Sequence, residues 1–452
     1  MKKKIITLST FIAIFTITMF VLIYLCFFAD KQFLDLGYSN QDIKLFHKYQ
    51  IENKITKYNQ SFVYSLHSAD FNENNLDYYL LFDGQLDYTD SINKLASMYS
   101  LEQIKQIKTV LSSDEAVELI ETDKIENIES FIQLFSKGYT IKDSVILANN
   151  IDKEQLPKFL EVKLENSVES FVSLINKGYQ SDILINLYNK IGEEKFSLLT
   201  DFKYFADLSD YLQYEDFNFN LLARYKWYQQ NQNVSIEKAI NDVNKNYDFI
   251  EDPDFSKFYD SATQCESESL TMIVSKSSYL SQDFEPSDLQ EVDSNYRNGN
   301  ISLNSSAIES FIQMSDDCYQ QTDRRILIVT GYQSYQVAES LYNDYLSNSA
   351  DNDQTALESF VNKPGYSEHQ TGLAIDICQK GYSHNEFDEC ISSDWVYQNC
   401  YNYGFILRYP SSRAFITGNY FTSYHYRYVG LQPAKVIGTF KFTLEEYNFL
   451  FD

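Results

Sequence analysis

The stretch from Ser367 to Asp376, with the sequence SEHQTGLAID, places an imidazole and a carboxylate, those of His369 and Asp376, seven residues apart. On a continuous helix seven residues span about 10.5 Å, whereas the ligands of a zinc ion lie about 2.0–2.2 Å from it. The two side chains can therefore reach one ion only if the chain folds back between them. Gly372 permits such a reversal, and the five residues that follow it alternate as a strand does, with Asp376 on the face opposite the aliphatic side chains.

A third ligand candidate is His425, in the segment YHYRYV from Tyr424 to Val429. Alternation puts His425 and Arg427 on one face of this predicted strand and the tyrosines on the other. Two imidazoles and one carboxylate bound to zinc leave one coordination position open, which is the arrangement of a catalytic zinc site. The sequence thus predicts that His369 and Asp376 meet His425 at one metal ion.

The chain of 452 residues is strongly acidic, with a net charge of -27 and a pI near 4.5. Its length is enough for two or three domains. An acidic surface repels the phosphates of nucleic acids and of anionic membranes. We therefore expect no nucleic acid among the partners of this protein.

The N-terminal region predicts a membrane anchor. Residues 5–28 carry no charge, follow three lysines at residues 2–4, and exceed the roughly 20 residues that a bilayer-spanning helix needs. Positive charge before the span predicts a cytoplasmic N-terminus, with the bulk of the chain extracellular. We expect a single-pass protein of the cell membrane, held through residues 5–28, and a cleaved signal peptide is the alternative.

Five cysteines follow this span: Cys265, Cys318, Cys378, Cys390 and Cys400. An odd number allows at most two disulfides within the chain, and the sequence does not choose the pairs. Because zinc-finger spacing is absent, no cysteine-ligated metal is expected.

Residues 30–255 contain few glycines and prolines, which favours helices. The segment ESF to KGY at residues 129–139 recurs at residues 169–179, a shift of 40 residues. Each copy predicts an amphipathic helix that ends at a C-cap glycine. A period near 40 is typical of stacked helical pairs. Two roles fit this region, a spacer and a concave surface that binds a peptide or protein.

After residue 255 strands and helices mix, which predicts an α+β domain. The predicted helices cover residues 305–317, 340–346 and 394–403, and the predicted strands cover residues 326–329, 373–377, 405–409 and 424–429.

Five motifs in this domain resemble, in consistent order, those of the VanY-type D-Ala-D-Ala carboxypeptidases, which are zinc peptidases of bacterial cell-wall peptides. The motifs are TGYQSY at 330–335, PGYSEHQTGLAID at 364–376, WVYQNCYNYGFILRYP at 395–410, ITG at 416–418 and YHYRYVG at 424–430. The resemblance implies that Zn²⁺ is held by His369, Asp376 and His425, that Ser367 helps to hold the substrate, and that the partner is a peptidoglycan stem peptide.

The resulting organisation has three parts. Residues 1–29 are a cytoplasmic tip and transmembrane anchor, residues 30–255 an all-α helical repeat stalk, and residues 256–452 an α+β zinc peptidase-like domain. The function implied for the last part is zinc-dependent hydrolysis of the terminal amide of wall peptides.

Two positions depart from the family pattern. Thr422 stands where the family has the glutamate that acts as the base, and Gln333 stands where it has an arginine that grips the substrate. Glu368 belongs to the family motif itself and is a poor substitute for the missing base. The alternative function is therefore a catalytically silenced protein that keeps zinc and binds wall peptide.

Overall fold

The computed structural model describes residues 14–22, 28, 30–82, 89–162, 164–203, 207–245, 256–348 and 361–451. Its contacts divide the chain into two compact units, Met1–Val168 and Glu169–Asp452. Of the predicted membrane span, residues 5–13 and 23–27 lie outside the described residues. Among the residues that the structure describes, no helix has the length and apolar character needed to cross a membrane.

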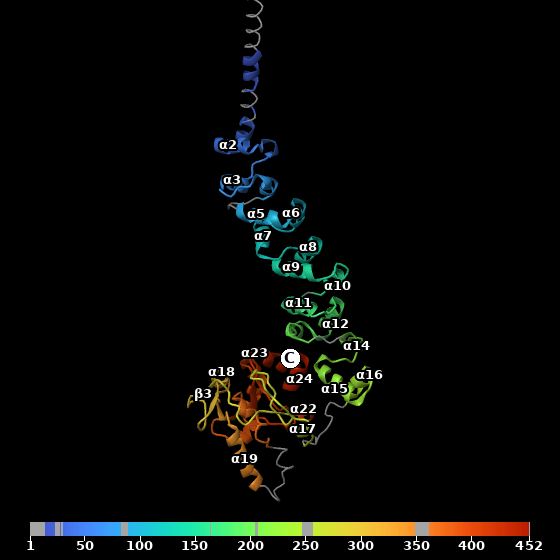
Figure 1. Cartoon of the computed structure of the whole chain (residues 1–452), viewed down its shortest axis with the longest axis vertical. Helices are drawn as coiled ribbons and strands as arrows, with labels where there is room; N and C mark the ends of the chain where they lie inside the picture. The colour runs from blue at the N-terminus through green and yellow to red at the C-terminus, as the bar shows by residue number, and fades with distance from the viewer. Residues whose placement is uncertain are drawn as a thin grey trace, which may run out of the picture. The chain divides into compact units, whose positions relative to one another are not determined.

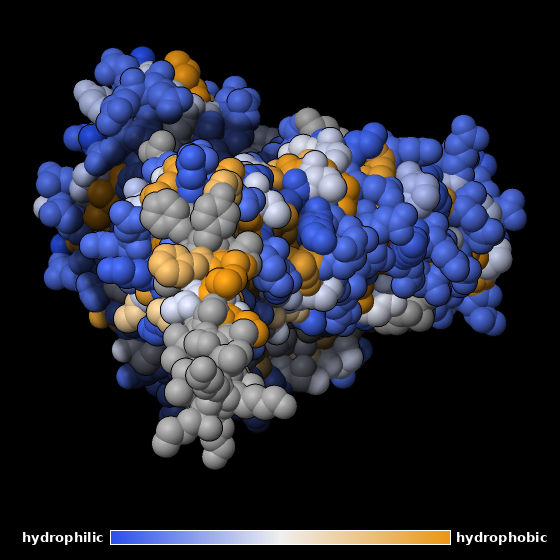
Figure 2. Space-filling view, turned by 90° about the horizontal axis from the view of Figure 1, so that it is seen from above, coloured by the Kyte–Doolittle hydropathy of each residue, from blue (hydrophilic) through white to orange (hydrophobic). Residues whose placement is uncertain are grey.

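The first unit is built from short helices joined by turns (Figure 1). They are α2 (Asn40–Tyr49), α3 (Gln60–His67), α4 (Leu76–Tyr79), α5 (Thr89–Met98), α6 (Leu101–Ile107), α7 (Ser113–Glu118), α8 (Ile128–Ser136), α9 (Ile141–Asn150) and α10 (Leu156–Phe159). Each buries its apolar side, as Phe131 and Leu134 of α8 do. Across the whole chain, hydrophilic side chains cover most of the face shown in Figure 2, where hydrophobic ones form small groups.

The tyrosines of the predicted repeat share one role. Gly138 ends the first copy with a φ of 98°, a conformation that favours glycine. The hydroxyl of Tyr139, the next residue, accepts a hydrogen bond from the backbone amide of Leu164 at 3.1 Å. In the same way the hydroxyl of Tyr99 accepts from the amide of Ile125 at 2.9 Å. The tyrosine of the repeat therefore forms a hydrogen bond that connects its helical pair to the loop that follows it.

The second unit begins with more helices of the same kind: α11 (Val168–Asn176), α12 (Ser181–Ile191), α13 (Glu193–Phe196), α14 (Leu208–Leu212), α15 (Leu222–Gln232), α16 (Ile236–Lys245) and α17 (Ser256–Asp260). The repeat tyrosine keeps its role here, because the hydroxyl of Tyr179 donates to the carbonyl of Lys203 at 2.8 Å. The last helices of the repeat region thus belong to the same compact unit as the α+β domain.

The α+β domain contains a four-stranded antiparallel sheet with the strand order β5-β6-β8-β7. Its strands are β5 (Ile326–Thr330), β6 (Ala374–Gln379), β7 (Phe405–Leu407) and β8 (His425–Tyr428). Short strands before the sheet pair as β1 (Thr263–Gln264) with β2 (Ser278–Tyr279) and β3 (Leu289–Glu291) with β4 (Ser302–Asn304). The helices are α18 (Ser305–Thr322), α19 (Tyr335–Asn348), α21 (Ile391–Asn399), α22 (Ala414–Thr417), α23 (Leu431–Phe440) and α24 (Leu444–Phe451).

Each predicted strand and helix of this domain is present, but some boundaries were wrong. The helix predicted at 340–346 begins at Tyr335, because the hydroxyl of Ser334 accepts from the amide of Val337 and caps it. The strand predicted at 405–409 ends at Leu407. Pro410 follows soon after and cannot donate to a sheet.

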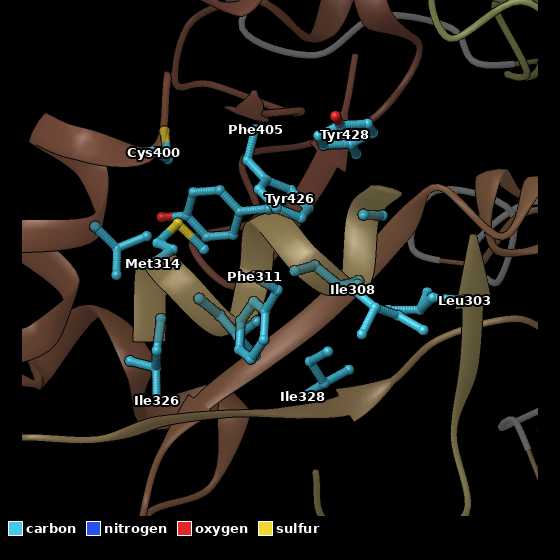
Figure 3. Close-up of a cluster of buried hydrophobic side chains, with 14 of the residues drawn as sticks. Leu303, Ile308, Phe311, Met314, Ile326, Ile328, Cys400, Phe405, Tyr426 and Tyr428 are labelled. Atoms are coloured by element: carbon cyan, nitrogen blue, oxygen red, sulfur yellow. The ribbon is translucent and has the colours of Figure 1, made fainter. Parts of the chain in front are cut away.

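One face of the sheet packs on α18. Figure 3 shows Phe311 of this helix gathered with Ile328 of β5 and Tyr426 of β8. The aliphatic residues of β6 that the sequence placed on this face, among them Ile375 and Ile377, are fully buried in the same cluster. The polar side chains that alternate with them must therefore lie on the opposite face of the sheet.

The five described cysteines are free thiols. Cys378 and Cys400 are buried, and Cys400 lies in the apolar cluster of Figure 3. Burial raises the pKa of Cys400 to about 12. This thiol therefore acts as a small core residue.

Candidate metal centre

The chain reverses immediately before β6, as the sequence required. Glu368–Thr371 form a single 3-10 turn, η6, which is capped by the hydroxyl of Ser367 accepting from the amide of His369. Gly372 ends the turn in the left-handed conformation, with a φ of 69°. A Cβ at this position would lie 2.7 Å from the Cδ2 methyl of Leu289, a side-chain end that can shift, so it is the backbone angle that requires glycine.

This reversal and the strand register bring three side chains together. Asp376 of β6 is paired directly with His425 of β8, and its Oδ1 lies 2.8 Å from Nδ1 of that histidine. Its Oδ2 lies 3.3 Å from Nε2 of His369. The three ligating atoms all lie within 4.8 Å of one another. The geometry therefore places the three predicted metal ligands at one point.

The ring of His369 is oriented by a backbone carbonyl. Its Nδ1 donates to the carbonyl oxygen of Gly331 at 2.9 Å, and this bond turns Nε2 toward Asp376. Gly331 follows a bulge in β5 between Ile328 and Thr330. A Cβ on Gly331 would lie 2.5 Å from Ile301, so only glycine lets the carbonyl approach here.

The ring of His425 packs on an aromatic ring and faces a second carboxylate. It stacks on Tyr409, with ring centroids 5.0 Å apart and planes 14° from parallel. Its Nε2 lies 3.6 Å from Oε2 of Glu368. A histidine ligand whose second ring nitrogen faces a carboxylate is a recurrent feature of metal sites, because it fixes the orientation of the ring.

Glu368 is itself buried in an ion-pair network. Its Oε1 accepts from Nε of Arg408 at 2.7 Å and from Nη1 of Arg427 at 2.8 Å, and all three side chains are fully buried. Nη2 of Arg408 lies 2.6 Å from Oε1 of a further carboxylate, Glu445. Burial alone would raise the pKa of Glu368, but the two guanidinium groups hold it well below its usual range. Glu368 is therefore a permanent anion that supports His425.

Burial and neighbouring charges also have opposite effects on the pKa values of the ligands Asp376 and His425. Burial alone would raise the pKa of Asp376, but the imidazoles of His369 and His425 hold it well below its usual range. Burial opposes the charged form of His425, yet Asp376 and Glu368 outweigh it and raise the pKa of His425 to about 9. The centre thus concentrates negative charge, and a divalent cation can replace the proton on His425.

This donor set fits zinc. Zinc binds histidine nitrogen and carboxylate oxygen at about 2.0–2.2 Å, so ligand atoms around one ion lie about 3–4 Å apart. The separations of 2.8 and 3.3 Å already fall near this range. Because Nδ1 of His369 donates to the carbonyl of Gly331, the other ring nitrogen, Nε2, is the one that faces the position of the ion.

Of the remaining predicted site residues, Ser367 and Gln333 contact the turn that carries His369, and Thr422 contacts its own loop. Ser367 caps η6 through its bond to the amide of His369 at 3.4 Å. The backbone amide of Gln333 donates to the backbone carbonyl of His369 at 3.2 Å, so Gln333 also lies beside the turn. The hydroxyl of Thr422 donates to the carbonyl of Tyr420 at 3.2 Å and is therefore engaged with its own loop.

The sequence analysis missed the roles of Arg408 and Arg427. A signal existed for Arg427, because alternation already placed it beside His425 on an inward face. An arginine that is fully buried requires a carboxylate partner. No comparable pattern identifies Arg408, which lies just beyond the end of β7.

Fold and donor set together define an α+β domain with a candidate metal centre, and comparison with known proteins specifies its family. The model of the VanY family of D-alanyl-D-alanine carboxypeptidases matches residues 300–431. The bifunctional D-Ala-D-Ala dipeptidase and carboxypeptidase VanXYC of Enterococcus gallinarum is 38% identical over 131 residues, which cover 28% of this chain and 67% of the relative. The chain therefore belongs to the VanY family.

Two further proteins are similar. The protein YodJ of Bacillus subtilis (strain 168), whose name classes it as a carboxypeptidase, is 34% identical over 193 residues, covering 40% of this chain and 67% of YodJ. A mutant of the vancomycin resistance D,D-pentapeptidase VanY, solved in complex with Zn(II), is 26% identical, with a TM-score of 0.35 and coverage of 40% of this chain and 99% of that structure.

Proposed function

We propose that this protein is a zinc-dependent D-alanyl-D-alanine carboxypeptidase that acts on peptidoglycan stem peptides. The observation that carries the proposal is the convergence of His369, Asp376 and His425 on one point, in a domain of the VanY family. A zinc ion held there would act as a Lewis acid on the carbonyl of the terminal amide and would make water more acidic.

The residues of the chain itself supply orientation and charge. Gly331 and Glu368 fix the two imidazole rings from outside, so that the ligands are held before any ion arrives. Ser367 and Gln333 lie at the turn that carries His369. Their position beside a metal ligand supports the proposal that they contact the peptide end.

A second candidate function is favoured by Thr422. A positioned base contributes about 10²–10⁴-fold to such a reaction, and a hydroxyl group cannot take up a proton at neutral pH. The hydroxyl of Thr422 is, moreover, bound to the carbonyl of Tyr420. Gln333 offers a dipole where a full positive charge would stabilise developing negative charge, a difference of about 10²–10³-fold. The second candidate is thus a protein that keeps zinc and binds wall peptide without cleaving it.

The test is the release of D-alanine from a pentapeptide that ends in two D-alanines, with purified ectodomain loaded with one equivalent of Zn²⁺. Release that stops when His425 is changed to alanine supports the carboxypeptidase. Binding of the same peptide without release, measured by calorimetry, supports the silent binding protein. Absence of both binding and release would contradict both functions.

We further propose that residues 5–28 anchor the protein in the cell membrane, with the bulk of the chain outside. The support is the uncharged run and the lysines that precede it. A C-terminally tagged chain should fractionate with membranes at full length and be digested by protease added outside the cells. A shorter tagged chain in the medium would instead indicate a cleaved signal peptide.

A further inference from the structure

A buried ion pair joins the helical region to the α+β domain within the second unit. Nε of Arg224, on α15, lies 2.6 Å from Oε1 of Glu446, on α24, and both side chains are only 3% exposed. The two residues are 222 positions apart in the sequence. The helices that carry them lie side by side (Figure 1). A pair so deeply buried holds its two helices in one arrangement, because separating two buried opposite charges is costly.

Glu446 also caps the helix on which it lies. Its Oε2 accepts from the amide of Thr443 at 2.8 Å, and its own amide donates to the hydroxyl of Thr443 at 3.2 Å. This is a capping box at the start of α24. Arg224 therefore holds the first turn of α24.

Glu445, the neighbour of Glu446 in that turn, is connected to the metal centre through Arg408. Glu445 accepts from Nη2 of Arg408 at 2.6 Å and from Nη1 at 3.1 Å. Nε of the same guanidinium donates to Glu368 at 2.7 Å, and Glu368 faces His425. A shift of the first turn of α24 would therefore be transmitted to the carboxylate that orients a metal ligand.

The helical region also holds the other end of α24. The amide of Lys203 donates to the carbonyl of Leu450 at 2.8 Å. The rings of Phe202 and Phe451 pack edge to face, with centroids 5.6 Å apart. Both ends of α24 thus depend on residues that precede the family domain in the sequence.

We propose that Arg224 is a positioning residue of the metal centre, which acts through Glu446 and the first turn of α24 on Arg408 and Glu368. This inference rests on the proposed function, because it assumes that the centre holds a metal ion. It makes residues 169–245 part of the catalytic unit in addition to any role as a spacer.

The test compares Arg224→Gln with Lys226→Gln in the full ectodomain. Lys226 lies two residues further along the same helix, so it points to a different side of it, and it forms an ion pair with Asp207 at 2.5 Å. Zn²⁺ affinity is measured by competition with a chromophoric chelator, and the absorption spectrum of Co²⁺ reports the geometry of its ligands. Residues along such a network change affinity about 2- to 30-fold. Arg224→Gln should fall in this range with an altered Co²⁺ spectrum, whereas Lys226→Gln should match wild type.

A double variant, Arg224→Met with Glu446→Gln, covers the case in which the single variant does not fold. It leaves no unpaired buried charge, and glutamine retains the cap of α24. Its Zn²⁺ affinity should also fall.

The outcomes separate the two proposals. A folded variant whose affinity and Co²⁺ spectrum equal those of wild type would overturn the role of Arg224 while leaving the metal centre intact. Wild-type protein that binds neither ion would overturn the proposed function instead.

Discussion

Asp376 and His425 face each other directly across two adjacent antiparallel strands, β6 and β8, although they are 49 positions apart in the sequence. The side-chain period of a strand is two residues, so a shift of one residue in the pairing would turn His425 toward the apolar core. The metal centre therefore depends on the strand register, which the buried aliphatic and tyrosine side chains of the opposite face enforce.

Replacement of a ligand should abolish metal binding. Purified ectodomain is expected to retain about one zinc per chain by elemental analysis, because three protein ligands are typical of a catalytic zinc site. His369→Ala should contain none after dialysis. His47→Ala, which changes a histidine paired with Asp30 and Glu52 in the first unit, should keep its zinc. Metal-free wild-type protein would contradict the assignment of this centre.

Neutralising Glu368 should both weaken the metal centre and destabilise the fold. In Glu368→Gln the buried guanidinium groups of Arg408 and Arg427 lose their shared anion, and breaking such a buried pair costs about 3–5 kcal/mol. Loss of a group that orients a ligand also lowers metal affinity about 10–100-fold. Chemical denaturation and chelator competition measure the two effects. Glu389→Gln, at an exposed position, should change neither.

Restoring the family residues should raise activity. In Thr422→Glu a carboxylate replaces the hydroxyl at the position of the base, so D-alanine release should rise by about 10²–10⁴-fold. Adding Gln333→Arg should raise it further. The rates are compared with Ser423→Glu, which places the same charge one residue away. Equal rates in the variants with glutamate at 422 and at 423 would show that position 422 has no special role.

Removing the hydroxyl of a repeat tyrosine should loosen the loop that it binds. Tyr139→Phe leaves the amide of Leu164 without its bond, and an unsatisfied buried group costs about 1–3 kcal/mol. Hydrogen exchange followed by mass spectrometry should show faster exchange around residue 164. Tyr58→Phe, at an exposed ring, serves as the control. Unchanged exchange in Tyr139→Phe would mean that the ring alone holds the loop.

The first helical pair should lose stability in acid. Burial alone would raise the pKa of Asp42, but its bonds to His67 and Ser39 hold it below its usual range. A depressed pKa in the folded state stabilises at neutral pH, and this contribution is lost as the pH falls below about 4. Asp42→Asn should therefore speed exchange of residues 40–49 at pH 7, and the difference from wild type should shrink toward pH 3. A difference independent of pH would contradict this role.

Sequence patterns located the helical repeat, the strands of the sheet and the three candidate ligands, because each depends on local periodicity. The 40-residue repeat of ESF to KGY identified helices that end in glycine. Alternation after Gly372 assigned Asp376 to the polar face of β6. Local patterns predicted the ends of elements less accurately. The cap at Ser334 set the start of α19, and Pro410 follows the end of β7.

The sequence by itself determined which residue types could form a zinc site and that the chain must reverse at Gly372, since glycine conformation and strand periodicity are local properties. Only the tertiary structure decided that Glu368 is a buried anion shared by Arg408 and Arg427, and that Arg224 reaches Glu446. These pairs join residues 40 to 222 positions apart. Their partners are selected by burial, because a charge removed from water must find an opposite charge wherever packing brings one within reach.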